Sequence, residues 1–378
     1  MPQVRVLLVQ LASMGDCLFV TAIARQIKEI DFPNCHLTWL IGSRYTPAIE
    51  NNPYVDAVIQ IPLLSIKDIA KQRDFIGQHI NNAGGYNKFN EIFITDYTPN
   101  NQGNWFGTTR SALFRSYPHK LKVNPQPIIY LTDVEKANVE GFCKNNNINN
   151  VSYNVLFECA PQSGQALMSI EKAIEIAERI SSKNSNIKFI LSSNESFAST
   201  NSNIIDGSQI SWRENAELAN YCNLIVGCSS GISWLCTSQW TKSLPFIQIV
   251  NPNYAGRRFS ASMKIDFKFY GIESNNLIEL YNPSEDLLHE CIFSVTENNF
   301  NKIKNLYDVT DNSYFSNYRF LRDARILLPE KAGLFIKWVL PNIFFNVYKK
   351  TKPRCFTPNK WWLNIKNIFG SYMSKSNL

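Results

Sequence analysis

The sequence has few residues of the kinds that bind metals or form disulfide bonds. Its nine Cys are scattered through 378 residues with no C-x-x-C pair, and its four His stand apart from one another. This spacing gives no reason to expect a zinc or iron site, and we expect no metal and no cofactor. No signal peptide is recognisable, so we expect the cysteines to be reduced, buried thiols of a cytoplasmic protein.

Long apolar runs and the common nucleotide motifs are missing as well. The longest strongly apolar stretch, 334–348, is interrupted by Lys337, Pro341 and two Asn. It is shorter than the roughly 20 residues that span a bilayer, so we expect no transmembrane helix. The glycine-containing loops match neither G-x-G-x-x-G nor the Walker A pattern, which argues against dinucleotide binding and ATP hydrolysis.

Acidic residues are scarce after position 300. The net charge is +7; residues 301–378 carry 14 Lys and Arg against four acids, a net +10, and the rest of the chain carries −3. A nearly neutral body with a basic, aromatic end favours contact with an anionic membrane surface over nucleic-acid binding. Lys349, Lys350 and Trp361-Trp362 follow the apolar stretch as in an interfacial anchor. Alternatively these residues pack onto the body; we expect 313–345 to pack and those beyond 349 to touch the membrane.

Apolar runs of strand length alternate with helical patterns through the first 250 residues. Strands are predicted at 4–10, 36–41, 55–61 and 91–95 and again at 152–159, 187–191, 224–227 and 246–250. Helices are predicted at 17–30, 47–50, 65–80, 169–181, 215–221 and 232–239, and a capping box of Thr132 and Glu135 opens a further one. The alternation indicates an α/β protein made of two Rossmann-like halves, each with an open parallel sheet.

The asparagine-rich stretch 145–150 is the most linker-like segment of the body. We therefore predict an N-terminal Rossmann-like domain at 1–148 and a C-terminal one at 149–300. A helical, basic and aromatic extension is predicted at 301–378.

Ligands of open parallel sheets bind beyond the carboxyl ends of the strands, where three loops of this chain qualify: 11–16, 161–165 and 228–231. In the first loop, Asp16 is either a general base in a cleft between the domains or the N-cap of the following helix. The other two loops contain small residues whose backbone N–H groups suit a phosphate at a helix N-terminus. For Ser229 and Ser230 the alternative is an ordinary serine N-cap.

These segments together resemble glycosyltransferase family 9, the lipopolysaccharide heptosyltransferases of bacteria. The similarity covers roughly residues 3–255 and lies in Met14-Gly15-Asp16, Thr38-Trp39-Leu40, Asn52-Pro53-Tyr54-Val55-Asp56 and Ser229-Ser230-Gly231-Ile232-Ser233-Trp234. The last segment matches the family pattern D-T-G-x-S-H, with Ser229 in place of Asp and Trp234 in place of His. The family's usual Lys or Arg near the phosphates is absent from the loop P-Q-S-G-Q at 161–165.

The resemblance implies a GT-B fold, in which the two Rossmann-like domains face each other across a cleft. Asp16 matches the family's proposed base, which deprotonates an acceptor hydroxyl for inverting attack on the sugar. The residues expected to bind the donor diphosphate are Ser163, Gly164, Gln165, Ser229, Ser230, Gly231 and Ser233. The residues expected to bind the acceptor are Met14, Gly15, Arg110 and Arg115, although the two arginines could instead be salt-bridged structural residues. Arg257 and Arg258 could supply the missing cation or form a surface turn.

The expected function is sugar transfer, of heptose or a hexose-like sugar, from a nucleotide-diphospho-sugar to a lipopolysaccharide or other surface-glycan acceptor. The expected location is cytoplasmic, peripheral at the inner face of the cytoplasmic membrane, with no nucleic-acid partner. Because the donor loops depart from the family pattern, one alternative is a catalytically degenerate nucleotide-sugar-binding or scaffold protein. A nucleotide-sugar epimerase of the same architecture is another alternative, which the scarcity of His disfavours.

Overall fold

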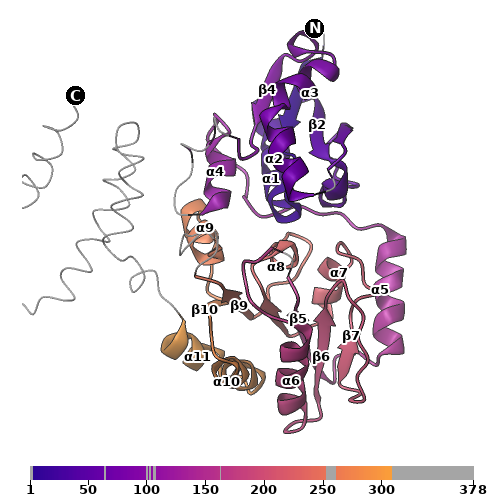
Figure 1. Cartoon of the computed structure of the whole chain (residues 1–378), viewed down its shortest axis with the longest axis vertical. Coiled ribbons are helices and arrows are strands. Elements are labelled where there is room, and N and C mark those ends of the chain that lie inside the picture. Colours follow the sequence, from indigo (N-terminus) through magenta and orange to yellow (C-terminus); the bar gives the residue numbers. More distant parts are fainter. Residues whose placement is uncertain are drawn as a thin grey trace, which may run out of the picture. The chain divides into compact units, whose positions relative to one another are not determined.

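The structure is a computed structural model that describes residues 3–308, except 64, 99–100, 102–103, 105–107, 162 and 253–260 (Figure 1). The segment 334–348, the basic residues around it, Arg257 and Arg258 lie outside the described residues. The expected membrane contact therefore stays a prediction. Among the described residues, no helix is long and apolar enough to cross a membrane.

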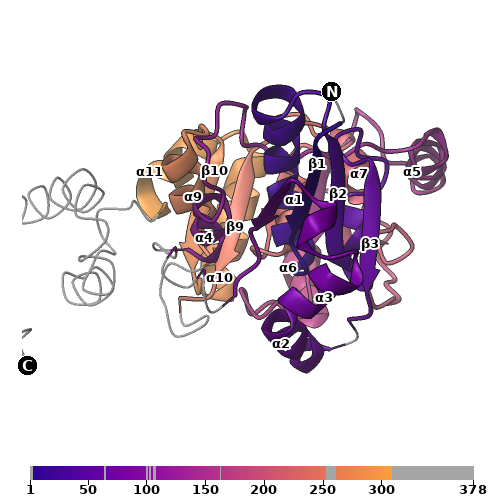
Figure 2. The ribbon, with the colours of Figure 1, turned by 90° about the horizontal axis from the view of Figure 1, so that it is seen from above.

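The amino-terminal half is built on a sheet of four parallel strands. These are β1 (Arg5–Val9), β2 (His36–Gly42), β3 (Ala57–Ile61) and β4 (Glu91–Ile94), in the order β3-β2-β1-β4. Residues 6–9 of β1 are fully buried because the sheet is covered on both faces. Val6 and Leu8 pack in a core with α1 (Met14–Gln26), while Leu7 and Val9 pack in another with α3 (Ile76–Asn82) (Figure 2).

The helices of this half differ from the predicted ones at their ends. α1 starts at Met14, three residues before the predicted start, and continues into the π-helical turn η1 (Ile27–Asp31). The single helix predicted at 65–80 is wrong: α2 (Ile66–Asp74) and α3 are separated at Phe75, where the backbone leaves the helical region. The helix predicted at 47–50 is instead the 3-10 helix η2 (Ser43–Ala48); η3 (Tyr86–Lys88) and α4 (Thr109–Arg115) complete the half.

The carboxyl-terminal half has six parallel strands in the order β10-β9-β8-β5-β6-β7. Their bounds are β5 (Tyr153–Glu158), β6 (Ile187–Ser192), β7 (Ile204–Asp206), β8 (Leu224–Gly227), β9 (Phe246–Val250) and β10 (Leu277–Tyr281). The strands predicted at 224–227 and 246–250 have the bounds of β8 and β9. The sequence reading assigned no strand to β7, which has only three residues, or to β10. The predicted fold class, two halves with parallel sheets, is confirmed.

Helices cover both faces of this second sheet. The helices from residue 133 to residue 308 are α5 (Asp133–Asn145), α6 (Ile170–Ser181), α7 (Asn215–Asn220), α8 (Gly231–Leu235), α9 (Met263–Tyr270), α10 (Glu285–Thr296) and α11 (Phe300–Tyr307); of these, α9 packs against α4. α5 opens with the predicted capping box of Thr132 and Glu135, and it packs against α7. α8 is shorter than the predicted helix 232–239 because the chain turns after Cys236. The boundary near 148 stays a prediction.

The two halves share one hydrophobic core where α1 meets α8 (Figure 1). The rings of Phe19 on α1 and Trp234 on α8 lie 4.9 Å apart between centroids, and both side chains are fully buried. Eight of the nine cysteines are described, and all eight are buried and unpaired, as predicted; Cys355 lies outside the described residues. Packing between α1 and α8 therefore brings the loop at 11–16 next to the turn at 228–231.

Candidate active site

The loop that carries Asp16 is held by a buried carboxylate from the neighbouring strand. Asp96, two residues after β4, is fully buried and accepts hydrogen bonds from the backbone N–H groups of Leu11 (2.7 Å) and Ala12 (3.3 Å). It also pairs with Arg73 of α2. Burial raises the pKa of Asp96, while Arg73 and the two N–H groups oppose that shift. The sequence reading missed Asp96, although an acid just beyond a strand next to β1 was a usable signal.

Asp16 lies in the first turn of α1, three residues after the N-cap. The N-cap is Ser13, and Asp16 Oδ2 is 3.1 Å from Ser13 Oγ and 3.4 Å from Ser13 N in a capping box. The interpretation of Asp16 as the N-cap is therefore wrong, because the helix starts at Met14 rather than at 17. Its other oxygen, Oδ1, is 3.8 Å from Nε of Arg110, and 16% of the Asp16 side chain is exposed.

Gly15 and Gly231 allow the two halves to meet beside Asp16. A Cβ atom at Gly15 would lie 3.3 Å from Cα of Gly231 and 3.4 Å from Trp234 Cδ1. A Cβ atom at Gly231 would lie 3.0 Å from Trp212 Nε1. Backbones can approach this closely only where side chains are absent. The structure thus brings Met14, Gly15 and Asp16 close to the turn at 229–231, while the roles expected for these residues stay predictions.

A second buried carboxylate, Glu158, organises that turn. Glu158 ends β5 and accepts hydrogen bonds from the N–H of Cys228 (2.8 Å), the hydroxyl of Ser233 (2.7 Å) and the hydroxyl of Ser230. Burial raises its pKa to about 7. The Ser230 oxygen also accepts a bond from Ile232 N–H (3.3 Å), so Ser230 is the N-cap of α8, which was the alternative interpretation of this serine. Sequence reasoning missed Glu158, whose signal was an acid at the end of a buried strand.

The hydroxyls of Ser230 and Ser233 are therefore directed at Glu158, and Ser233 is fully buried. Ser229 has a left-handed backbone (φ 56°), and its hydroxyl donates to the carbonyl oxygen of Ala261. This turn can bind a ligand through its backbone, because the N–H groups of Ser229, Ser230 and Gly231 donate to no acceptor within the described part of the chain.

Gln165 joins the two loops expected to bind the donor. Its Oε1 lies 3.2 Å from Ser229 Oγ and 3.3 Å from Nη2 of Arg110. Its backbone N–H donates to Ser163 Oγ at 3.3 Å. Gly164 between them is exposed and has a left-handed φ of 68°. The loops at 163–165 and 229–231 are thus neighbours, and Arg110 touches the first of them.

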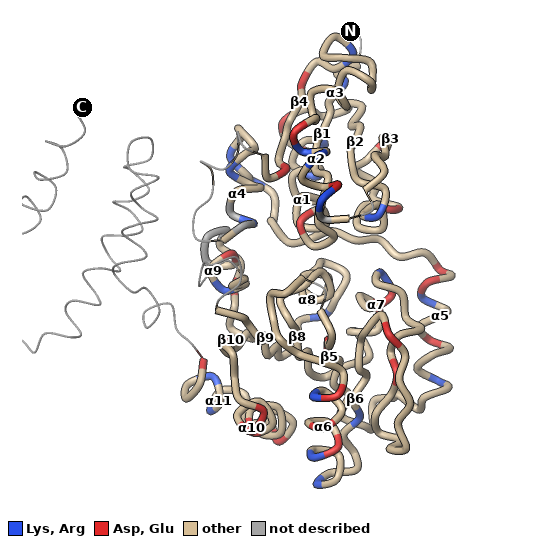
Figure 3. Tube along the Cα trace, viewed as in Figure 1, with Lys and Arg blue, Asp and Glu red and all other residues tan. Residues whose placement is uncertain are grey.

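Arg110 and Arg115 lie on α4 but have different surroundings. Arg110 is only 3% exposed and lies between Asp16, Asp266 and Trp234. Arg115 is half-buried, and its Nη1 donates to the carbonyl oxygen of Asn104 at 3.1 Å. Charged residues of both signs are interspersed over the rest of the described chain (Figure 3). Among the described residues, no group of three or more His, Cys, Asp and Glu could hold a metal ion.

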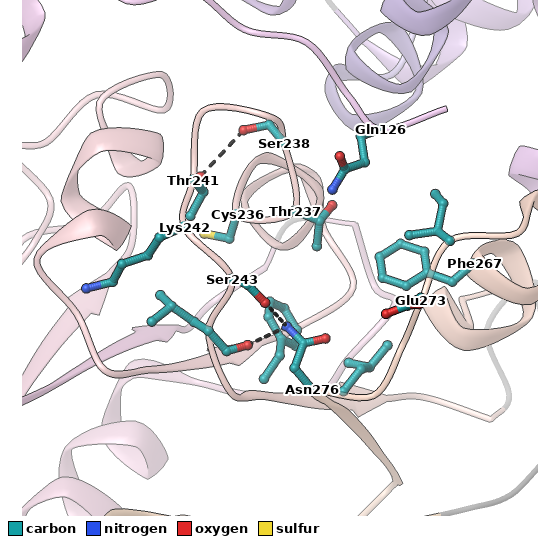
Figure 4. A pocket seen from close by; sticks show the side chains of 14 residues that line it. Gln126, Cys236, Thr237, Ser238, Thr241, Lys242, Ser243, Phe267, Glu273 and Asn276 are labelled. Atoms are coloured by element: carbon teal, nitrogen blue, oxygen red, sulfur yellow. Dashed lines mark hydrogen bonds between the residues drawn. The ribbon is translucent and has the colours of Figure 1, made fainter. Parts of the chain in front are cut away.

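A separate cavity of about 140 Å³ lies at the other end of the second sheet (Figure 4). Its lining includes Phe246 and Leu277, the first residues of β9 and β10, together with Ser243 and Asn276. Asn276 Nδ2 donates to Ser243 Oγ at 3.3 Å. Because parallel sheets bind ligands at the carboxyl ends of their strands, this cavity is not the candidate active site.

Comparison with solved structures identifies the architecture. A glycosyltransferase of family 9 from Veillonella parvula aligns with a TM-score of 0.51 at 14% identity, covering 86% of this chain and 97% of that protein. The ADP-heptose lipopolysaccharide heptosyltransferase II of E. coli also aligns with a TM-score of 0.51, at 12% identity, covering 79% of this chain and 99% of that protein. This chain has the GT-B fold.

The likeness in fold confirms, at the level of architecture, the family resemblance noted in the sequence. No model of a protein family matches the sequence, and no curated protein matches it either. Within the GT-B fold, Asp16 belongs to the first half and the loops at 163–165 and 229–231 belong to the second. The candidate site is therefore formed where the halves meet.

Proposed function

We propose that this chain is an inverting glycosyltransferase that transfers a sugar from a nucleotide-diphospho-sugar to a surface-glycan acceptor. The observation that carries the proposal is the juxtaposition of Asp16, from the first half, with the turn at 229–231 of the second half through Gly15 and Gly231. A donor held on the second half would present its anomeric carbon to an acceptor held on the first. The carboxylate of Asp16 would then lie beside the reacting hydroxyl.

In the proposed reaction Asp16 removes the proton from the acceptor hydroxyl. The oxygen forms a bond to the anomeric carbon as the bond from that carbon to the diphosphate oxygen breaks, and the electron pair stays with the diphosphate. Attack opposite the leaving group inverts the anomeric configuration. Backbone N–H groups of Ser229, Ser230, Gly231 and Gly164 would disperse the developing negative charge, since fixed dipoles stabilise it without reorganisation.

The donor and the location of the reaction are part of the proposal. One of the solved structures with this fold is named an ADP-heptose heptosyltransferase, so ADP-heptose is the first donor to test. The +10 charge of residues 301–378 supports work at the anionic inner face of the cytoplasmic membrane on a lipid-linked acceptor. Loss of vesicle binding when 349–378 is removed, with anionic and neutral vesicles compared, would test that part.

The test of the mechanism is Asp16→Asn, assayed for sugar transfer with a panel of nucleotide sugars. Asp68→Asn is a matched control, because Asp68 has the same position in α2 and pairs with its N-cap Ser65 at 2.8 Å. Asp16→Asn is expected to lower the transfer rate at least 1000-fold and Asp68→Asn to leave it unchanged, and the product should have inverted configuration by NMR. Full activity of Asp16→Asn would remove the assigned base.

The degenerate alternative has its own outcome in the same panel. Because the Ser230 and Ser233 hydroxyls are bonded to Glu158, the second half depends on backbone groups to hold a diphosphate. A chain that binds nucleotide sugars but turns over none of them, with surface-glycan acceptors present, would be the binding or scaffold protein instead.

A further inference from the structure

Arg110 belongs by sequence to the first half, yet its guanidinium lies against the second. It is carried by α4, and α4 packs against α9. Its Nη2 donates to Oε1 of Gln165 at 3.3 Å, and its Cζ lies 4.4 Å from the centroid of the Trp234 ring. Both partners belong to the part of the chain that the proposed function assigns to the donor. This placement differs from the acceptor role expected for Arg110 from the sequence.

The cation is buried, and its hydrogen-bonding capacity is not used up. Only 3% of Arg110 is exposed, and its Nε has no hydrogen-bond partner among the residues that the structure describes. The two nearest carboxylates, Asp16 at 3.8 Å from Nε and Asp266 at 3.8 Å from Nη1, are beyond hydrogen-bond distance. A buried donor without a partner is costly, so the guanidinium is set up to receive an anion with several oxygen acceptors.

The neighbouring acid does not cancel this cation. Asp266 is fully buried, accepts a hydrogen bond from the Thr108 hydroxyl, and burial raises its pKa to about 7. Within the described part of the chain, Oδ2 of Asp266 has no hydrogen-bond partner either. The face of Trp234 also favours a cation above it. Two carboxylates and an aromatic face thus hold the guanidinium in place beside the donor loops without saturating its N–H groups.

We propose that Arg110 binds the diphosphate of the donor and takes the place of the Lys or Arg that the loop at 161–165 lacks. The inference rests on the proposed function. A guanidinium offers two parallel N–H groups to phosphate oxygens, and its charge stabilises the oxygen that receives the electron pair when the sugar leaves. Since Nε faces Asp16, the same side chain also fixes the distance between base and leaving group. Arg110 would therefore be a catalytic residue supplied to the donor by the opposite half.

The test measures binding of ADP and UDP, and of adenosine and uridine, to the full chain by calorimetry. The wild type should bind one diphosphate at least tenfold more tightly than its nucleoside. Arg110→Gln should lower the diphosphate affinity at least tenfold and leave the nucleoside affinity within about twofold. Arg25→Gln is the control, because Arg25 pairs with Glu29 one turn away at 2.9 Å, their side chains being 27% and 37% exposed, and the change should alter neither affinity.

The outcomes separate the inference from the proposed function. If the wild type binds neither diphosphate nor any nucleotide sugar, the proposed function is wrong, and so is the role proposed for Arg110. If the wild type binds but Arg110→Gln keeps the same ratio of diphosphate to nucleoside affinity, only the role of Arg110 is overturned. The same holds if Arg110→Gln raises only the KM for the acceptor. Should Arg110→Gln not fold, Arg110→Met is measured instead, because it keeps an unbranched apolar side chain and removes the charge; an unchanged ratio of diphosphate to nucleoside affinity would overturn the inference.

Discussion

Arg213 offers the sharpest test of how the two halves are fixed to each other. It lies just before α7, and only 6% of its side chain is exposed. Its guanidinium donates to Glu135 Oε1 at 2.5 Å and to the carbonyl oxygens of Pro47 (2.8 Å), Glu50 (3.1 Å) and Tyr130. One side chain of the second half thus ties down the η2 region of the first half and the segment that connects the halves.

Arg213→Ala leaves all of these acceptors without their donor. A hydrogen bond to a charged group contributes about 1.5–3 kcal/mol, but bonds to one side chain do not add. Removing one partner of a buried ion pair costs about 3–5 kcal/mol. We therefore expect the free energy of unfolding to fall by about 3–5 kcal/mol. Trp212 precedes Arg213 in the sequence and lies beside Gly231, so loss of the Arg213 contacts should shift Trp212 and lower transfer activity as well.

The assay is urea unfolding followed by tryptophan fluorescence and far-UV circular dichroism. Arg179→Ala is the control, because Arg179 and Asp286 form a 2.8 Å pair whose side chains are 39% and 86% exposed. Such surface pairs contribute about 0–1 kcal/mol. Arg213→Lys keeps the charge but loses the planar set of N–H donors, so its loss of unfolding free energy should lie between those of Arg213→Ala and Arg179→Ala. A loss for Arg213→Ala no larger than that for Arg179→Ala would refute the role given to Arg213.

Three further outcomes follow from burial and close packing. The pKa of Glu158 rises from 4.5 to about 7 on folding, so its contribution to stability is present below pH 4.5 and is lost as the pH rises through 7. In Glu158→Gln, the loss of unfolding free energy between pH 4.5 and 7, measured by urea unfolding, should therefore be smaller by about 3 kcal/mol. The same loss in the variant as in the wild type would contradict this. Gly15→Ala should lower both Tm and transfer activity, because the added Cβ would lie 3.3 Å from Cα of Gly231. At Gly141 in α5 no described atom lies within 4 Å of an added Cβ, so Gly141→Ala should leave Tm unchanged or stabilise the fold by up to about 1 kcal/mol. In the native chain the eight buried thiols should resist a thiol reagent until urea is added, so more than one fast-reacting thiol would disagree with the structure.

The strands were predictable where burial alone decides the residue types. A strand in the middle of a parallel sheet is covered on both faces, and it therefore appears in the sequence as a short, continuous apolar run. β8 and β9 are such strands, and their bounds were obtained correctly. β7 has three residues at the edge of the sheet, too few to give a pattern. The break at Phe75 between α2 and α3 depends on backbone geometry that the apolar spacing does not encode.

The candidate site was predictable only in part, for a related reason. The loops at the carboxyl ends of strands follow from the fold class, and they were placed correctly. The half that the Arg110 guanidinium contacts is set by Gln165 and Trp234, which are 55 and 124 positions away along the chain. Spacing within a single segment carries no information about such contacts. The helix start at Met14, which decides that Asp16 is not the N-cap, likewise depends on Ser13 and its hydrogen bonds.

The two halves use the same device to shape the site. In each half, a buried acid at or just beyond the end of a strand accepts hydrogen bonds from backbone N–H groups of the loop that follows the neighbouring strand. Asp96, just after β4, holds the loop after β1 in this way, and Glu158 at the end of β5 holds the turn after β8. Both carboxylates are fully buried, so each loop is fixed from within the sheet and not by its own sequence.

This arrangement also gives a physical meaning to the departures from the family pattern in the second half. Ser229, where the family has Asp, lies with its Oγ 3.2 Å from Oε1 of Gln165, so the two loops proposed to bind the donor are in contact. Trp234, where the family has His, is fully buried and provides the face on which Arg110 rests. The turn at 229–231 carries no charged side chain, and the loop at 161–165 has no Lys or Arg. The positive charge that this loop lacks is present on α4, where Arg110 lies over the Trp234 ring. These residues therefore support the role proposed for Arg110 over the alternative of a degenerate binding protein.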